Sequence, residues 1–182
     1  MSEKKLYPFE SKFPQIDKAV FTADGVRIIG DVEIKEGSNI WYNVVIRGDV
    51  NFVKIGRNTN IQDNSMLHVT GGIAPLIIGD NVTVGHNVTL HGCTLKNNCL
   101  VGMGAIVLDR AVVEENSLVA AGSVVKEGFT VPSGKLVAGV PAKIIRDLTK
   151  EEIDHFIVSA NNYVALAVKS EKSLKEFDTK NN

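Results

Sequence analysis

Aliphatic residues recur at every sixth position through most of this 182-residue chain, and this period constrains the fold more than any other feature. The series contains Ile28, Ile34, Ile40, Ile46, Ile55, Ile61, Leu67, Ile78, Val84, Leu90, Leu95, Val101, Val107, Val113, Val119, Val125, Val131 and Val137. A six-residue repeat is typical of β-solenoids, in which each hexapeptide forms one short strand and one corner. Because three hexapeptides close one triangular coil, the series predicts an all-β parallel solenoid of about six coils.

Two insertions interrupt the period. Three extra residues lie between Ile46 and Ile55, and five extra residues lie between Leu67 and Ile78. The second insertion contains two glycines and a proline, which favour a short loop that leaves the solenoid. This loop directly follows His68, so it lies beside a candidate functional residue.

A C-terminal amphipathic helix is expected after the solenoid. Thr149 and Glu152 have the spacing of a capping box, which marks a helix N-terminus. The apolar stripe that follows consists of Ile153, Phe156, Ile157, Ala160, Val164, Ala167 and Val168. This spacing predicts a helix of about five to six turns that packs along the solenoid or a neighbouring subunit. The expected segments are a lead-in (1–25), the solenoid (26–142), the helix (143–170) and a polar, fraying tail (171–182).

Composition excludes several classes of function. The net charge is −1 with both signs interspersed, which gives no basic patch for nucleic acid. No apolar run approaches the roughly 18 residues of a membrane-spanning helix, and the N-terminus has no targeting pattern. Cys93 and Cys99 are the only cysteines, too few for a disulfide scaffold. We therefore expect a cytoplasmic protein with two buried free thiols, no membrane partner and no nucleic-acid partner.

Three of the four histidines fall between positions 68 and 91. Exactly three repeats separate Ile46 from Leu67, and three more separate Leu67 from Leu90. His68 and His91 therefore occupy the same position on consecutive coils, about 4.8 Å apart at the strand spacing. Arg47 takes the same position one coil earlier. Two imidazoles stacked in this way can converge on one metal ion, with Zn–N distances of about 2.0–2.1 Å.

His86 belongs to another face of the solenoid, where Gln62 is nearby one coil earlier. Within one chain it should point away from His68 and His91. If all three bind one metal, His86 must come from an adjacent subunit of a closed cyclic homotrimer. Three neutral imidazoles with one open position form the pattern of a catalytic zinc site. The competing interpretations are that these histidines are ordinary surface residues, or that Cys93 is a fourth ligand.

The sequence around these histidines resembles the γ-class carbonic anhydrases of the hexapeptide-repeat superfamily. The resemblance runs from Phe9 to about Tyr163, and its specific marks are the segments 47–49, 60–63, 67–69 and 85–92. It implies that the solenoid is a left-handed parallel β-helix. It further implies a homotrimer with zinc, or iron or cobalt in its place, at the interfaces between subunits.

The resemblance also implies roles for individual residues. His68, His86 and His91 would bind the metal, and a metal-bound hydroxide would attack CO2 to give bicarbonate. Gln62 would orient that hydroxide, and Arg47 would form an ion pair with Asp49 across the subunit interface. Asn60 and Tyr163 match positions near the metal in this family.

Two departures from the family pattern leave the activity open. Well-known members carry a glutamate at the position of Val50 and a long acidic loop that moves protons, whereas the loop 69–76 contains no acidic residue. One alternative is therefore a metal-binding trimer with weak or no anhydrase activity. The other is a hexapeptide acyltransferase that uses an acyl-CoA, with one histidine as general base.

Overall fold

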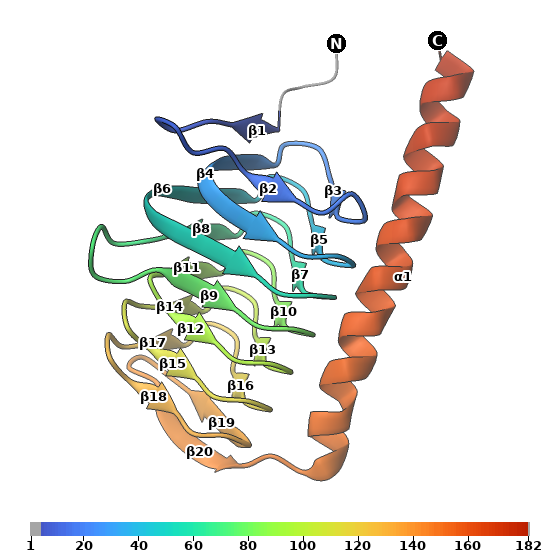
Figure 1. Ribbon diagram of the computed structural model, residues 1–182. Coiled ribbons are helices and arrows are strands. Elements are labelled where there is room, and N and C mark those ends of the chain that lie inside the picture. The colour runs from blue at the N-terminus through green and yellow to red at the C-terminus, as the bar shows by residue number, and fades with distance from the viewer. Residues whose placement is uncertain (1–4, 182) are drawn as a thin grey trace.

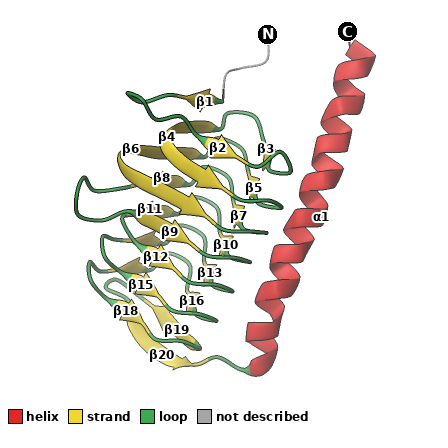
Figure 2. Cartoon of the chain, viewed as in Figure 1, coloured by secondary structure: helices red, strands yellow, loops and turns green. Residues whose placement is uncertain are grey.

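The computed structural model describes residues 5–181 and consists of a stack of short parallel strands with one long helix beside it (Figure 1). The strands are joined into a 12-stranded and an 8-stranded sheet. The colouring by secondary structure shows that turns connect the strands within the solenoid and that, among residues 5–181, the one long helix is C-terminal (Figure 2). The predicted fold class, a parallel β-helix followed by one C-terminal helix, is confirmed.

The strands are mostly two or three residues long because each hexapeptide must also supply a corner. Their bounds are β1 Leu6–Tyr7, β2 Gln15–Ile16, β3 Phe21–Thr22, β4 Arg27–Ile34, β5 Asn39–Ile40, β6 Val45–Ile55, β7 Asn60–Ile61, β8 Met66–His68, β9 Leu76–Ile78, β10 Thr83–Val84, β11 Thr89–His91, β12 Thr94–Leu95, β13 Leu100–Val101, β14 Ile106–Val107, β15 Val112–Val113, β16 Leu118–Val119, β17 Val124–Val125, β18 Thr130–Val131, β19 Lys135–Ala138 and β20 Lys143–Asp147.

The repeated aliphatic residues form the core, as predicted. Ile46 pairs with Leu67, Leu67 with Leu90, and Leu90 with Val107 in successive parallel ladders. All four side chains are fully buried. Stacking aliphatic side chains along the axis removes them from water, and this burial is the main favourable contribution to a solenoid of such short strands.

The solenoid has about seven turns, one more than the repeat count suggested. The additional turn comes from the lead-in: β1 and β2 both pair with β4, and β3 pairs with β5. The spacing between β1 and β2 departs from six residues, so this coil carries no repeat in the sequence. Its pairing covers the strand edges that β4 and β5 would otherwise expose at the N-terminal end.

Helix α1 (Lys150–Asn181) begins as the capping box predicts. Its first turn is capped because the Glu152 backbone N–H donates to Thr149 Oγ1 at 3.3 Å, and the Thr149 N–H donates to a Glu152 carboxylate oxygen at 2.9 Å. Phe156, Ala160 and Ala167 are buried against the solenoid. No helix among residues 5–181 is long and apolar enough to cross a membrane.

Both ends of the helix differ from the bounds predicted by the sequence. Residues 143–147 form β20, which pairs antiparallel with β19, so the helix begins seven residues after position 143. It also continues past residue 170, through most of the segment expected to fray. Ion pairs one turn apart support these last turns, such as Lys175 with Glu171 at 2.8 Å. Residues 1–4 of the lead-in and residue 182 of the tail lie outside the described residues.

Candidate metal centre

His68 and His91 lie directly beside one another at the ends of β8 and β11. The two residues are register partners in the parallel ladder. Their ring centroids are 5.0 Å apart, and His68 Nδ1 lies 3.1 Å from His91 Nε2. The stacking predicted from the repeat period is therefore present in the structure.

A carboxylate contacts the far side of each of these rings. His68 Nε2 lies 3.1 Å from Asp49 Oδ1, and His91 Nδ1 lies 2.6 Å from Asp109 Oδ1. An ionised carboxylate only accepts hydrogen bonds, so each contacted nitrogen must be the N–H donor. In the neutral tautomers this leaves a lone pair on His68 Nδ1 and another on His91 Nε2, facing each other. Two facing lone pairs at 3.1 Å repel unless a proton or a metal cation lies between them.

Both carboxyl groups are held in the charged form. Burial raises the pKa of Asp49, but hydrogen bonds from Arg47 and His68 outweigh it, so that pKa is below its ordinary value. Burial likewise opposes the hydrogen bonds that Asp109 receives from Thr70 and His91, and the pKa of Asp109 is also lowered. The two aspartates are therefore acceptors at neutral pH, as the tautomer argument requires.

Arg47 and Asp49 form an ion pair within one chain. They are two residues apart on β6, so their side chains lie on the same side of the strand. The resemblance implied a pair across the subunit interface; the pair that the structure shows lies within one chain. Asp49 thereby connects Arg47 to His68, and the guanidinium belongs to the same cluster as the imidazole pair.

His86 lies on the turn after β10, at another corner of the solenoid. Its Nδ1 is 2.7 Å from Asp63 Oδ2, and its side chain is 45% exposed. Asn64 and Asn87 have positive φ angles of 61° and 57°, the left-handed conformation that asparagine tolerates better than most residues. These two residues turn the chain just after Asp63 and His86. The aspartate thus fixes the Nδ1–H tautomer and leaves Nε2 as the free acceptor.

Gln62 and Asn60 form a buried chain of hydrogen bonds one coil before His86. Asn60 Nδ2 donates to Thr83 Oγ1 at 2.9 Å, and Gln62 Nε2 donates to Asn60 Oδ1 at 3.0 Å. This order fixes the orientation of both amides. The Gln62 carbonyl oxygen is then the atom that can accept a hydrogen bond from a ligand.

Tyr163 projects from α1 onto the same corner. Its ring packs edge-on against Trp41, with ring centroids 5.7 Å apart. Burial, and then the charge of Asp63, raise the pKa of the Tyr163 phenol above its ordinary value. The phenol therefore stays neutral and lies near the aspartate that holds His86.

The residues predicted for the site thus form two clusters in one chain. The first contains Arg47, Asp49, His68 and His91; the second contains Asn60, Gln62, His86 and Tyr163. Within the part of a single chain that the structure describes, no three His, Cys, Asp or Glu side chains are arranged to hold a metal ion.

The sequence interpretation missed Asp109 and the partnership of Asp63 with His86. Val107 pairs with Leu90, and Asp109 follows Val107 by two residues. An acidic residue one coil after His91 could therefore have indicated this contact. Asp63 lies one coil before His86, on the corresponding turn. Both contacts depend on turn geometry that the six-residue period does not specify.

The donor set fits a metal such as zinc. Two nitrogen ligands in a tetrahedral zinc site are separated by about 3.4 Å when the Zn–N bonds are about 2.0–2.1 Å. The 3.1 Å between His68 Nδ1 and His91 Nε2 is close to this value. Carboxylate partners on the outer nitrogens of all three histidines are the usual support for imidazole ligands.

The two thiols take no part in either cluster. Cys93 and Cys99 are free and buried, and burial raises the pKa of each thiol to about 12. A protonated, buried thiol is a poor nucleophile. We expect a disulfide reagent to label neither cysteine in the native protein at about pH 8 and both after unfolding in urea. Labelling of the native protein would contradict this placement.

Comparisons with known proteins agree with the fold. Residues 75–109 match a family described as the hexapeptide repeat of succinyl-transferase. The chain is similar to gamma carbonic anhydrase 2, mitochondrial, of Arabidopsis thaliana, with 49% identity over 173 residues that cover 92% of this chain and 62% of that protein. The chain therefore spans less than two thirds of the length of this plant relative.

Two further similar proteins align with this chain over most of their own length and most of its length. The carbonic anhydrase of Geobacillus kaustophilus is 50% identical over 148 residues, which cover 81% of each chain. The solved structure of a hexapeptide transferase family protein from Anaplasma phagocytophilum is 48% identical, with a TM-score of 0.86 and coverage of 91% of this chain and 97% of that one. Together with the histidine pair and its carboxylates, these similarities show that the chain belongs to the γ-class carbonic anhydrase family of hexapeptide-repeat proteins.

Proposed function

We propose that this protein is a zinc-dependent carbonic anhydrase whose metal sites are shared between the subunits of a homotrimer. The observation that carries the proposal is the pair of facing nitrogens, His68 Nδ1 and His91 Nε2, at 3.1 Å. Their outer partners, Asp49 and Asp109, leave both nitrogens as acceptors, so the position between them suits a cation.

His86 of a neighbouring subunit supplies the third ligand in this proposal. Its Nδ1 is held by Asp63, its Nε2 is free to coordinate, and its side chain is nearly half exposed at a corner of the solenoid. A threefold rotation can bring this corner of one chain against the His68–His91 face of the next and produce three equivalent sites. The site is then incomplete in any single chain.

The neutral ligand set defines the chemistry. Zinc held by three imidazoles supplies Lewis-acid activation of water at neutral pH, which is what CO2 hydration requires. The Gln62 carbonyl oxygen accepts the O–H of the reacting group and so orients it toward CO2. Arg47, held by Asp49, places a positive charge where bicarbonate forms.

The proton must leave by a different route from that of members with an acidic loop. The loop 69–76 has no carboxylate, and its Thr70 hydroxyl donates to Asp109 Oδ2 at 2.7 Å. That hydrogen bond supports a histidine ligand instead of carrying a proton to solvent. We propose that buffer molecules accept the proton and that turnover is slow at low buffer concentration.

The experiment is stopped-flow CO2 hydration by zinc-loaded protein at about pH 8 over a range of buffer concentrations. We expect a zinc-dependent rate that rises with buffer and disappears after the metal is removed with a chelator. A protein that contains zinc but shows no hydration at any buffer concentration would support the alternative of a metal-binding trimer without anhydrase activity.

Asp109→Asn tests the support of His91 without removing a ligand. The amide can donate where the carboxylate only accepts, so the Nδ1–H tautomer of His91 is no longer enforced. We expect zinc affinity to fall by about 10–100-fold, as for other partners of metal-bound histidines. Competition with a chromophoric chelator measures this, and Asp80→Asn, on a turn outside both clusters, is the matched control.

Acyl transfer is the second candidate, and it is favoured by the similarity to the hexapeptide transferase family protein of Anaplasma phagocytophilum. In that reaction a histidine would act as general base toward an acceptor hydroxyl or amine, and zinc would be unnecessary. Acyl-CoA consumption by zinc-free protein, with no CO2 hydration by the zinc-loaded form, would favour this function.

A further inference from the structure

The C-terminal end of the solenoid is closed by an exposed apolar hairpin. β19 and β20 pair antiparallel and form the last two strands of the 8-stranded sheet, at the end opposite to β1 (Figure 1). Val140, Ile144 and Ile145 on this hairpin are 73%, 49% and 56% exposed. We refer to these three residues together with Lys143 and Asp147 as the end patch.

Such an end is unusual for a repeat protein. Terminal repeats normally present a polar outer surface, because the last coil has no neighbour to cover it. Here a register shift opposite Leu136 and Val137 interrupts the alternation of β20, and both adjacent isoleucines are exposed. β20 is also an edge strand, with no further strand beside it among residues 5–181. Apolar side chains at an open edge favour association.

We propose that the end patch binds the end patch of a second copy, so that two assemblies join base to base around a twofold axis. An antiparallel arrangement of two β20 strands centred on Ile145 places Lys143 of each chain opposite Asp147 of the other. Lys143 and Asp147 are then complementary in charge around a central pair of Ile145 side chains. Ile144 faces Arg146, whose guanidinium is paired with Glu152 of its own chain. Self-complementarity is the requirement of a twofold interface.

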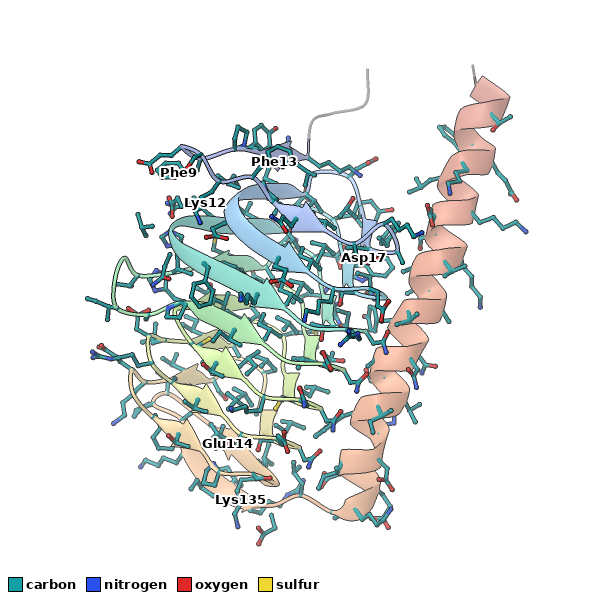
Figure 3. The ribbon with its side chains drawn as sticks, in the orientation of Figure 1. Phe9, Lys12, Phe13, Asp17, Glu114 and Lys135 are labelled. Atoms are coloured by element: carbon teal, nitrogen blue, oxygen red, sulfur yellow. The ribbon has the colours of Figure 1, made fainter. Side chains whose placement is uncertain are left out.

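The charged groups of Lys143 and Asp147 are both available for this pairing. Lys143 has no ion pair in the part of the chain that the structure describes, and it is exposed. Asp147 pairs with Lys135, yet its side chain is still 80% exposed and can accept a second cation. Lys135 lies at the lower end of the solenoid in Figure 3, which shows the side from which a second copy would approach.

The opposite end of the solenoid is the competing partner. Phe9 and Phe13 are exposed at the N-terminal end, where Figure 3 labels both. Binding between unlike ends would propagate without closing and would give an open series of assemblies. Binding between two end patches closes at two, so the distribution of masses separates the two arrangements.

This proposal does not depend on the metal site. The end patch lies on β19 and β20, whereas the histidines lie on or beside β8, β10 and β11. Whatever assembly forms around the metal, the end patch doubles it. The loss of the doubling and the loss of the metal-dependent trimer are therefore separate results.

Sedimentation velocity of the full chain tests the proposal. We expect wild-type protein at tens of micromolar to have about twice the mass of the Ile145→Glu variant, because a closed twofold interface joins two assemblies. Lys143→Glu and Asp147→Lys should each remove the doubling through repulsion between like charges. A mixture of these two variants should restore it, since the carboxylate introduced in one variant then faces the ammonium group introduced in the other.

Circular dichroism and thermal unfolding verify that each variant is folded, which is expected because every substituted side chain is exposed. The proposal is overturned if wild-type protein has the same mass as Ile145→Glu. It is also overturned if the charge variants keep the doubling, or if wild-type protein forms an open series of masses.

Discussion

His91→Ala is expected to lower bound zinc from about one ion per chain to less than about 0.1 and CO2 hydration by at least about 100-fold. The substitution removes one of the two facing nitrogens, so His68 Nδ1 no longer has a partner for the cation. Asp109 then lies beside an empty space instead of an imidazole. Metal analysis after gel filtration, with stopped-flow hydration, measures both effects.

The matched control is His155→Ala, which removes an exposed histidine of α1 that belongs to neither cluster. It should leave zinc content and rate unchanged. If His91→Ala keeps its zinc while remaining folded, the cation does not bind between His68 and His91, and the assignment of the ligands is wrong.

His86→Ala is expected to cause a loss of zinc as large as that in His91→Ala, although His86 belongs to the other cluster of the chain. The reason is that, in the proposed homotrimer, the third ligand of each site comes from the neighbouring subunit. Two imidazoles remain at every site, and two ligands hold zinc much more weakly than three. Equilibrium dialysis against a zinc buffer measures the change.

Asp63→Asn provides the graded comparison for this variant. It keeps the His86 ring but no longer enforces the tautomer with a free Nε2. Its zinc affinity should therefore fall by less than that of His86→Ala, by about 10–100-fold. A His86→Ala protein with wild-type zinc affinity would place the third ligand elsewhere. Equal effects of both substitutions would mean that His86 acts only through its contact with Asp63.

The period of the sequence was sufficient to predict the fold and the stacking of His68 on His91. A six-residue repeat leaves little freedom: once Leu67 and Leu90 are buried on the same face, the residues that follow them must be neighbours. The same phase placed His86 on another face. The structure has this arrangement, with His86 in one cluster and the His68–His91 pair in the other.

The features that escaped prediction do not depend on the period. β1 and β2 are not six residues apart, so the first coil was counted as a lead-in. The contacts of Asp63 and Asp109 depend on left-handed turns and an insertion, which shift side chains between coils. Beyond residue 170, where the predicted apolar stripe has ended, α1 carries charge pairs one turn apart, such as Lys175 with Glu171.

Mixing two inactive variants tests the shared site most directly. In a homotrimer each site takes His68 and His91 from one chain and His86 from the next, so neither His86→Ala nor His91→Ala alone can form a complete site. When the two variants are unfolded together and refolded at equal amounts, about one quarter of the sites regain all three ligands by chance association in a cyclic trimer. We predict recovery of about one quarter of the wild-type zinc and CO2 hydration. No recovery, in mixed trimers shown to have formed by differential tagging, would contradict a metal site built between subunits.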